Sequence, residues 1–230
     1  MLDPHAVATL PNAISAPRLA PYLARYNGND EFAIRLYAWN LEISAAFWGP
    51  LSMLEITLRN ALHDEMRRGR ADDDWWNLVA VDLESKERKA VDGAIDKLYF
   101  SGNSDPSADD VVGATSMGLW VGLLNVGVAR HPKYDYETKL WPRLKGAFPN
   151  RGTQGRRQIH AKLNRLRVLR NRIAHHEPLT RVNLTEQRDL IIDCISLMDQ
   201  DIAAYVDGSH RIDSVLASKE IAVKSGVCRF

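Results

Sequence analysis

The stretch RLRVLRNRIAHHEPL, residues 165–179, lies in a segment with a helical pattern that ends at Pro178. On a helix with about 100° per residue, five apolar side chains share one stripe: Ile159, Leu163, Leu166, Leu169 and Ile173. Almost opposite this stripe lie Arg157, Asn164, Asn171 and His175. Arg172 and His176 are four residues apart and form a further pair on a flank. The pattern predicts a helix over 153–177 with an apolar core face and a polar, cationic outer face.

Charge is distributed unevenly along the chain. Between Thr138 and His176 there is no Asp or Glu, whereas eleven positions carry Lys or Arg. Because the formal net charge of the whole chain is +1, the remaining residues must sum to −10. Such a block is typical of a surface that binds a polyanion, and a solvated basic face is the simpler alternative.

The composition is that of a globular protein able to bury a sizeable core: 230 residues, 45% of them apolar and 26% charged. Two cysteines, Cys194 and Cys228, are too few for a disulfide framework and indicate a reducing compartment. No basic region followed by an apolar core marks a secretion signal at the N-terminus. The uncharged segment 111–129 approaches the length of a membrane span, but its four glycines and flanking acids favour a buried helix that neighbours approach closely. We therefore expect a cytoplasmic protein that does not enter a membrane.

Several other segments have helical patterns, and no convincing strand alternation is present, so the fold class is all-α in a single domain. The expected elements are a long helix over 29–69 with an Asn29 cap, a short helix or plug at Trp75–Trp76, and helices over 84–100, 108–129, 184–206 and 212–222. Pro50 predicts a kink or two helices meeting within 29–69, and Ser107 with Asp110 predicts a capping box. The expected divisions are an N-terminal extension 1–14, a helical domain 15–207, and a short C-terminal helix and tail 208–230. Trp39, Trp48 and Trp120 are expected in the core, as are Trp75–Trp76 and the Cys194 thiol.

Arg170 projects only about 40° from the centre of the apolar stripe. Its guanidinium stays charged, so an acid or backbone carbonyls must hold it there. Glu55 sits with Arg59 at the edge of the apolar stripe in the helix PLSMLEITLRNALHDEM. Glu55 is therefore the predicted partner of Arg170.

The polar residues at the end of the basic helix have the chemistry of phosphodiester cleavage. His175 can move protons near neutral pH, a guanidinium matches phosphate, and Asn171 can orient either group. In a basic groove this set suits metal-free RNA cleavage, in which the ribose 2′-hydroxyl attacks the adjacent phosphate; DNA lacks that nucleophile. Arg170 and His175 lie about 140° apart on a regular helix. Either the helix distorts near its end, or a second copy supplies the complementary groups.

These residues also carry a family resemblance. LRNRIAHHEPL resembles the signature of the Abi-like proteins of the HEPN superfamily, in which an Arg is followed by four to six residues, the first commonly Asn, and then by His. The matching residues are Arg170, Asn171 and His175. The blocks LYAWNLEISAAFWGPLSMLEITLRNALHDEM and DDVVGATSMGLWVGLL are similar to conserved blocks of the same family, so the resemblance covers most of residues 15–205.

The resemblance implies an all-α HEPN-like bundle that forms a homodimer with two motifs in one cleft. The implied activity is that of a cofactor-free, metal-independent endoribonuclease, acting as a toxin in abortive phage infection or beside a protein or noncoding RNA antitoxin. Arg170 and His175 would be catalytic, with Asn171 beside them. Glu55, Arg59 and Asn60 would line the same cleft, and His176 would either contribute or cap the helix. The residues expected to contact RNA are Arg157, Asn164, Arg167 and Arg172.

Three alternatives remain open. The chain could be an inactive HEPN module that binds RNA or a partner protein with the same basic face. His175 and His176 could instead only complete a helix, because cations favour its C-terminal end. Zinc binding by HHE fits poorly, because adjacent histidines on a helix point about 100° apart. His63 and His160 are expected at the surface or at the edge of a cleft.

Overall fold

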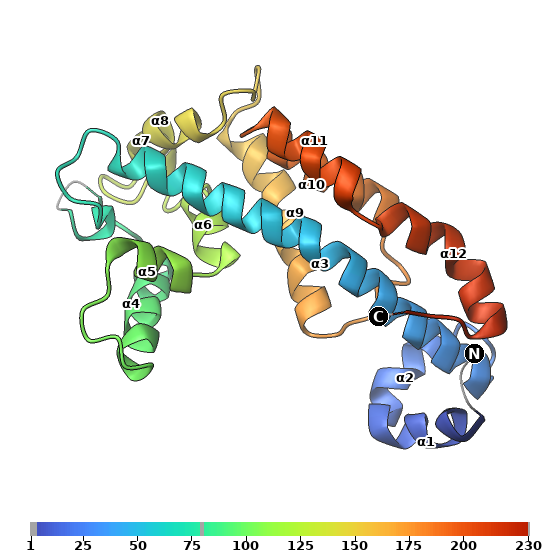
Figure 1. The fold of residues 1–230 in the computed structure, drawn as a ribbon. Coiled ribbons are helices and arrows are strands. Elements are labelled where there is room, and N and C mark those ends of the chain that lie inside the picture. Colours follow the sequence, from blue (N-terminus) through green and yellow to red (C-terminus); the bar gives the residue numbers. More distant parts are fainter. Residues whose placement is uncertain (1–3, 79–80, 230) are drawn as a thin grey trace. The chain divides into compact units, whose positions relative to one another are not determined.

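The structure, a computed structural model, describes residues 4–78 and 81–229, with side chains from Ala8 onward (Figure 1). Within these ranges the elements are helices, written α, and short 3-10 helices, written η, and no strand is formed. The elements are α1 (Pro4–Ile14), α2 (Ala16–Leu23), α3 (Asp30–Arg67), η1 (Trp75–Asn77), α4 (Ser85–Phe100), α5 (Ala108–Ala114), α6 (Met117–Leu123), α7 (Tyr136–Lys139), α8 (Trp141–Leu144), η2 (Lys145–Ala147), α9 (Arg156–Ala174), α10 (Leu184–Ser196), α11 (Gln200–Ser209) and α12 (Ile212–Ser225). The predicted all-α class is confirmed.

The chain divides into two compact units. Unit 1 comprises Met1–Ser52, Val168–Asp189 and Val206–Phe230, and unit 2 comprises Met53–Arg167 and Leu190–Tyr205. The predicted division into 1–14, 15–207 and 208–230 follows other boundaries and stays a prediction.

The longest helix, α3, begins as predicted. The Asn29 side-chain oxygen accepts a hydrogen bond from the Phe32 backbone N–H at 3.1 Å, which caps the first turn. Pro50 lies inside α3, and the helix continues through it to Arg67. The alternative of two separate helices meeting at Pro50 is therefore wrong, and a kink at Pro50 stays a prediction.

The apolar segment predicted as one helix over 108–129 forms two short helices, α5 and α6. The predicted capping box of Ser107 and Asp110 is present at the start of α5. The break has a local cause: the Thr115 hydroxyl donates to the Val112 carbonyl at 2.7 Å and accepts from the Trp120 indole N–H at 2.8 Å. Thr115 is extended, with ψ of 158°, so the helix stops and restarts.

The segment predicted as one helix over 184–206 is also divided, into α10 and α11. The Asp199 carboxylate accepts hydrogen bonds from the backbone N–H groups of Asp201 and Ile202, both at 2.9 Å. Asp199 therefore caps a new helix in the middle of a continuous apolar pattern. The sequence places Ile191, Ile195, Met198 and Ile202 on one apolar face of this segment; the first three are buried, and Ile202 is half-buried.

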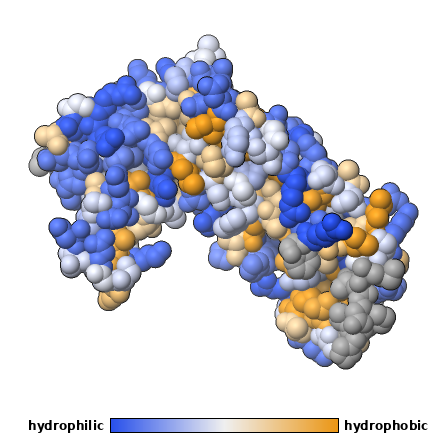
Figure 2. Space-filling model, in the orientation of Figure 1, coloured by the Kyte–Doolittle hydropathy of each residue, from blue (hydrophilic) through white to orange (hydrophobic). Residues whose placement is uncertain are grey.

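The remaining predicted helices are confirmed as α4, η1 and α12, although α12 extends to Ser225. The sequence patterns did not predict α1, α2, α7 or α8. Among the described residues, no helix combines the length and the apolarity that crossing a bilayer needs. Hydrophilic residues cover most of the surface in view in Figure 2.

In unit 1, two buried polar groups of α3 fasten distant segments. The indole N–H of Trp39 donates to the Val215 carbonyl of α12 at 3.0 Å. The side-chain oxygen of Asn40, which is 1% exposed, accepts from the Leu179 backbone N–H at 2.8 Å. The second bond fixes the chain five residues after α9 ends, directly beyond the HHEP turn.

The core of unit 2 is built on aromatic side chains. Trp75, Trp76 and Trp120 are buried as predicted, and the ring centroids of Trp75 and Trp120 lie 6.1 Å apart. The sequence predicts that neighbouring helices approach the small residues of 111–129 closely, and this is confirmed at Gly122 of α6. A Cβ there would lie 2.5 Å from the carboxylate of Glu87 in α4. Only glycine leaves room for that buried carboxyl.

We predict that Asn40→Leu lowers the free energy of unfolding by about 1–3 kcal/mol, because the buried Leu179 N–H loses its acceptor. Urea denaturation measures this difference. Asn60→Leu, at an exposed position of the same helix, is the matched control and should change stability by less than about 0.5 kcal/mol. Equal losses in the two variants would contradict the assigned role of Asn40.

Candidate functional site

The motif helix ends in a defined cap. The His175 N–H still bonds to the Asn171 carbonyl at 2.9 Å, as in a regular helix. The His176 N–H then bonds to the Ile173 carbonyl at 3.0 Å, and the Glu177 N–H bonds back to the Arg172 carbonyl at 2.8 Å. With His176 at φ of 55°, this pair of bonds is a Schellman motif that has histidine in the position usually held by glycine.

The helix therefore covers Arg156–Ala174 rather than the predicted 153–177, and its departure from helical geometry begins only at His176. Arg170 and His175 keep the angular separation of about 140° that regular spacing gives. The distortion foreseen near the helix end occurs at His176, one residue after His175. Both alternatives drawn from the sequence, a distorted helix end and a second copy that supplies the complementary groups, stay predictions.

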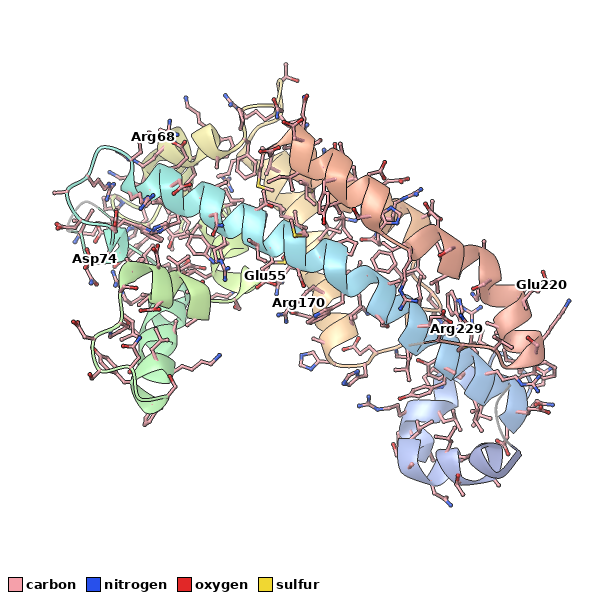
Figure 3. All side chains as sticks on the ribbon, in the orientation of Figure 1. Glu55, Arg68, Asp74, Arg170, Glu220 and Arg229 are labelled. Carbon is pink, nitrogen blue, oxygen red and sulfur yellow. The ribbon has the colours of Figure 1, made fainter. Side chains whose placement is uncertain are left out.

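Arg170 contacts an aromatic ring within unit 1. Its guanidinium carbon lies 5.4 Å from the centroid of the Trp48 ring of α3, which is a cation–π contact. Trp48 is 42% exposed, so its prediction as a core aromatic is wrong. Figure 3 marks Arg170 on α9 and Glu55 on α3. The ring adds a flat aromatic surface beside the guanidinium that sequence reasoning missed.

The other motif residues lie on the outer side of the same helix end. Asn171 is half-buried, and His175 and His176 are exposed. The half-buried Arg172 pairs with the exposed Glu177 at 3.2 Å across the Schellman motif. Glu177 is the first acid after the basic block, and it neutralises Arg172 rather than a motif residue.

The predicted RNA-contacting residues earlier in α9 belong to unit 2. Arg157 is exposed, and Asn164 and Arg167 are half-buried. The Asn164 side-chain oxygen accepts from Nε and Nη2 of Arg167 at 3.0 and 2.9 Å. This neutral amide orients the Arg167 fork without cancelling its charge.

The three cleft residues predicted on α3 also lie in unit 2. The Glu55 carboxylate accepts from the Met117 backbone N–H at 2.8 Å, at the first residue of α6. Arg59 donates from Nη1 to the Gly113 carbonyl at 3.2 Å, and Asn60 is exposed. The pairing of Glu55 with Arg170 stays a prediction, since Glu55 belongs to unit 2 and Arg170 to unit 1.

Two cations of the acid-free block pair with acids from outside it. Arg156 is buried and contacts Glu137 at 2.6 Å and the Leu124 carbonyl at 2.8 Å. Lys162 pairs with Asp193 of α10 at 2.7 Å. The acids that the block lacks are therefore supplied from outside it, and part of its charge is structural.

Other cations of the block line a hollow of about 520 Å³ in unit 2. Arg143, Lys145 and Arg151 are joined there by Arg68 from the end of α3, and Glu65 is the one acid in the lining. Glu65 pairs with Arg68 at 2.6 Å. The hollow keeps a surplus of positive charge, and Arg68 has no sequence signal that links it to residues 143–151.

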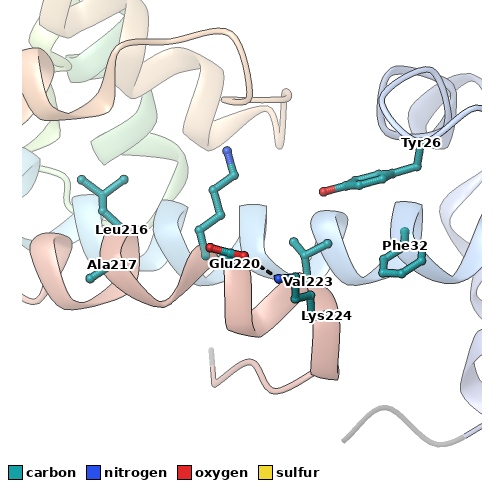
Figure 4. Close-up of a pocket in the computed structure, with 8 residues that line it drawn as sticks. Tyr26, Phe32, Leu216, Ala217, Glu220, Val223 and Lys224 are labelled. Carbon is teal, nitrogen blue, oxygen red and sulfur yellow. Dashed lines mark hydrogen bonds and ion pairs between the residues drawn. The ribbon is translucent and has the colours of Figure 1, made fainter.

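A second hollow, in unit 1, has a different character (Figure 4). Its volume is about 560 Å³, and Tyr26 and Phe32 stack in it with ring centroids 5.4 Å apart. Glu220 and Lys224, four residues apart on α12, form an ion pair across its lining. Glu220 and Lys224 neutralise each other, and Lys219 adds one positive charge to a largely apolar lining, so this groove suits a polyanion poorly.

The remaining reactive groups are mostly structural. Cys194 is 1% exposed, and burial raises the pKa of its thiol to about 12, as expected of an inert core thiol. His160 is half-buried, and burial lowers its pKa. His63 is 4% exposed and lines a hollow beside α3, so of its two predicted places the cleft edge fits and the open surface does not. Within residues 4–78 and 81–229, no three His, Cys, Asp or Glu side chains gather as they would around a metal ion.

Comparison with protein-family models, with curated proteins and with solved structures finds no match to this chain. The resemblance to the Abi-like proteins therefore rests on the quoted motif and on the two quoted blocks.

We predict that His176→Gly raises the free energy of unfolding by about 0.5–1 kcal/mol, because glycine adopts the left-handed conformation without the steric cost of a Cβ. Thermal or urea denaturation measures the gain. Ala174→Gly, two residues earlier and still helical, is the control and should lower stability by about 1 kcal/mol. A loss of stability in His176→Gly comparable to that in Ala174→Gly would contradict the cap described here.

Proposed function

We propose that this chain is a metal-independent endoribonuclease of the HEPN type. It would act in the cytoplasm as a toxin or effector in phage defence, through abortive infection or as part of a toxin–antitoxin pair. The observation that carries the proposal is the Arg170 guanidinium held over the exposed Trp48 ring, at the end of an acid-free helix that also presents Asn171 and His175.

The chemistry follows from these groups. His175 removes the proton from a ribose 2′-hydroxyl, and the O2′–P bond forms as the P–O5′ bond breaks. Arg170 stabilises the charge that develops on the phosphate oxygens, and its fork matches two of them. The leaving 5′-oxygen takes a proton from water, and the His175 imidazolium returns its proton to solvent, so the products carry a 2′,3′-cyclic phosphate and a 5′-hydroxyl. Asn171 orients the phosphate or the imidazole.

The surroundings of the motif support RNA as the substrate. Trp48 offers a ring on which an unpaired base can stack, which is the usual mode of single-stranded RNA recognition. Arg157 and Arg167 lie on the same helix, and unit 2 by itself carries a cationic hollow at Arg143 and Arg151. Contacts of this kind bind the phosphate backbone with little regard to sequence.

A homodimer completes the proposed site. Because Arg170 and His175 face sides of one helix that are about 140° apart, one copy aims only one of them at a given phosphate. A two-fold axis near the end of α9 would bring Arg170 of one copy to His175 of the other.

We predict that purified wild-type protein cleaves single-stranded RNA in EDTA and leaves 2′,3′-cyclic phosphate ends. His175→Ala and Arg170→Ala should each reduce the rate by about 100-fold or more, since each removes a group that acts in the transition state. Gel analysis of end-labelled RNA measures rates and end chemistry. Arg181→Ala, at an exposed arginine outside the site, is the control for lost charge. If RNA binds equally to wild type and His175→Ala and neither cleaves it, the chain is an inactive binding module instead.

We further predict that heterodimers containing one Arg170→Ala and one His175→Ala subunit recover activity, although each homodimeric variant is inactive. Of two shared sites, one keeps both groups, so about half of the wild-type rate is expected. Co-expression with two different tags and sequential purification isolates these heterodimers. An inactive heterodimer, or light scattering that gives a monomer for the active enzyme, would contradict the shared site.

A further inference from the structure

A small polar pocket in unit 2 carries an inference that does not depend on RNA cleavage. It lies between α3 and α5 and has a volume of about 360 Å³. Arg59, His63, Asp64 and Arg67 line it from α3, and Asp109 lines it from α5. The resemblance places Arg59 in the catalytic cleft, but it assigns no role to His63.

Two residues that line this pocket each have a buried N–H donor without an acceptor. Nδ1 of His63 accepts a hydrogen bond from the Trp75 indole N–H at 3.1 Å, so the proton of the neutral ring sits on Nε2. That Nε2 is buried and has no hydrogen-bond partner, and the same holds for Nε of Arg59. His63 and Arg59 are four residues apart, so they are neighbours on the face of α3.

Leaving two buried donors unpaired is costly, and a bound acceptor would remove that cost. A metal ion does not fit, because Nε2 of His63 carries a proton and Nδ1 is occupied. The carboxylates are placed differently: Asp64 and Asp109 are exposed, and Asp64 already pairs with Arg67 at 3.1 Å. Water screens these exposed charges, so the buried donors dominate the choice of ligand.

We propose that this pocket of unit 2 binds a single phosphate group. A phosphate presents several oxygens at once, so one group can accept from His63 and from the Arg59 fork together. The phosphate could be the end of an RNA or part of a small phosphorylated ligand, and the chemistry of recognition is the same.

Calorimetric titration with inorganic phosphate at constant ionic strength tests the proposal. Wild type should bind phosphate saturably, and Arg59→Gln should weaken binding about tenfold or more by removing a charged donor. Asp109→Asn should tighten binding several-fold, because it removes a neighbouring negative charge. Lys89→Gln, an exposed substitution on α4 outside the pocket, should leave binding unchanged.

Absence of saturable binding to wild type would overturn the proposal. So would equal affinities in wild type and Arg59→Gln, or weaker binding in Asp109→Asn. Circular dichroism of each variant checks the fold. Should Arg59→Gln fail to fold, nitrogen-15 NMR of histidine-labelled wild type replaces it. Phosphate should shift the His63 Nε2–H resonance saturably, and an unmoved resonance would overturn the site.

Three further probes identify the source of the phosphate, used with His175→Ala to prevent RNA cleavage. If RNA with a 5′-phosphate binds more tightly than the same RNA with a 5′-hydroxyl, and Arg59→Gln removes the difference, the ligand is an RNA end. If the two RNAs bind equally and a nucleoside monophosphate binds in an Arg59-dependent manner, the ligand is a small molecule. Failure of all three probes contradicts the site. An inactive wild-type enzyme that still binds phosphate would contradict only the proposed nuclease.

Discussion

The burial of one face of α9 is the constraint on which the rest of the site depends. Ile159, Leu163, Leu166, Leu169 and Ile173 are all at most 5% exposed. Burying each such side chain contributes about 1.5–3 kcal/mol to stability. Rotating the helix would expose the stripe, and that loss of free energy exceeds the stabilisation from any polar contact on the outer face. The direction of every polar side chain on α9 follows from this stripe. It sends Arg157 and His175 outward and leaves Arg170 at the margin, where the Trp48 ring receives its guanidinium.

The regular apolar pattern made this face predictable from the sequence. Features that depend on the contact of a single side chain were not predictable in this way. The apolar stripe, the Asn29 cap and the Ser107 capping box all depend on neighbours within a few residues, and sequence reasoning found them. The breaks at Thr115 and Asp199 were missed, because each is a polar residue that captures a backbone group inside an apolar run. Trp48 was misplaced for a similar reason. It lies in a row with Ser44 and Ser52 at four-residue spacing, so its neighbours on the helix surface already indicated a partly exposed side.

The sequence gives the total charge of the basic block, but not which of its cations are paired. The absence of acids over residues 138–176 is real, yet Arg156 and Lys162 find Glu137 and Asp193 just outside the block or far along the chain. A count of charges cannot separate such internal pairs from cations that face solvent. Neither can it place Arg68 beside Arg143, which depends on how the segment after α7 returns to the end of α3. The cationic surface is thus narrower than the charge block, and it includes Arg68 from outside the block.

The turn after α9 is held at both of its ends, and this bears on the chemistry proposed for His175. On one side the Schellman bonds fix His176 and Glu177 to the last turn of the helix. On the other, Asn40 binds the Leu179 N–H, and Arg25 donates to the Thr180 carbonyl at 2.9 Å. The backbone of His175 therefore has little freedom, and only its side-chain rotamers can change its aim. In the proposed site, a bound phosphate would therefore contact an imidazole whose backbone position is fixed. The second catalytic group would have to be positioned around that imidazole.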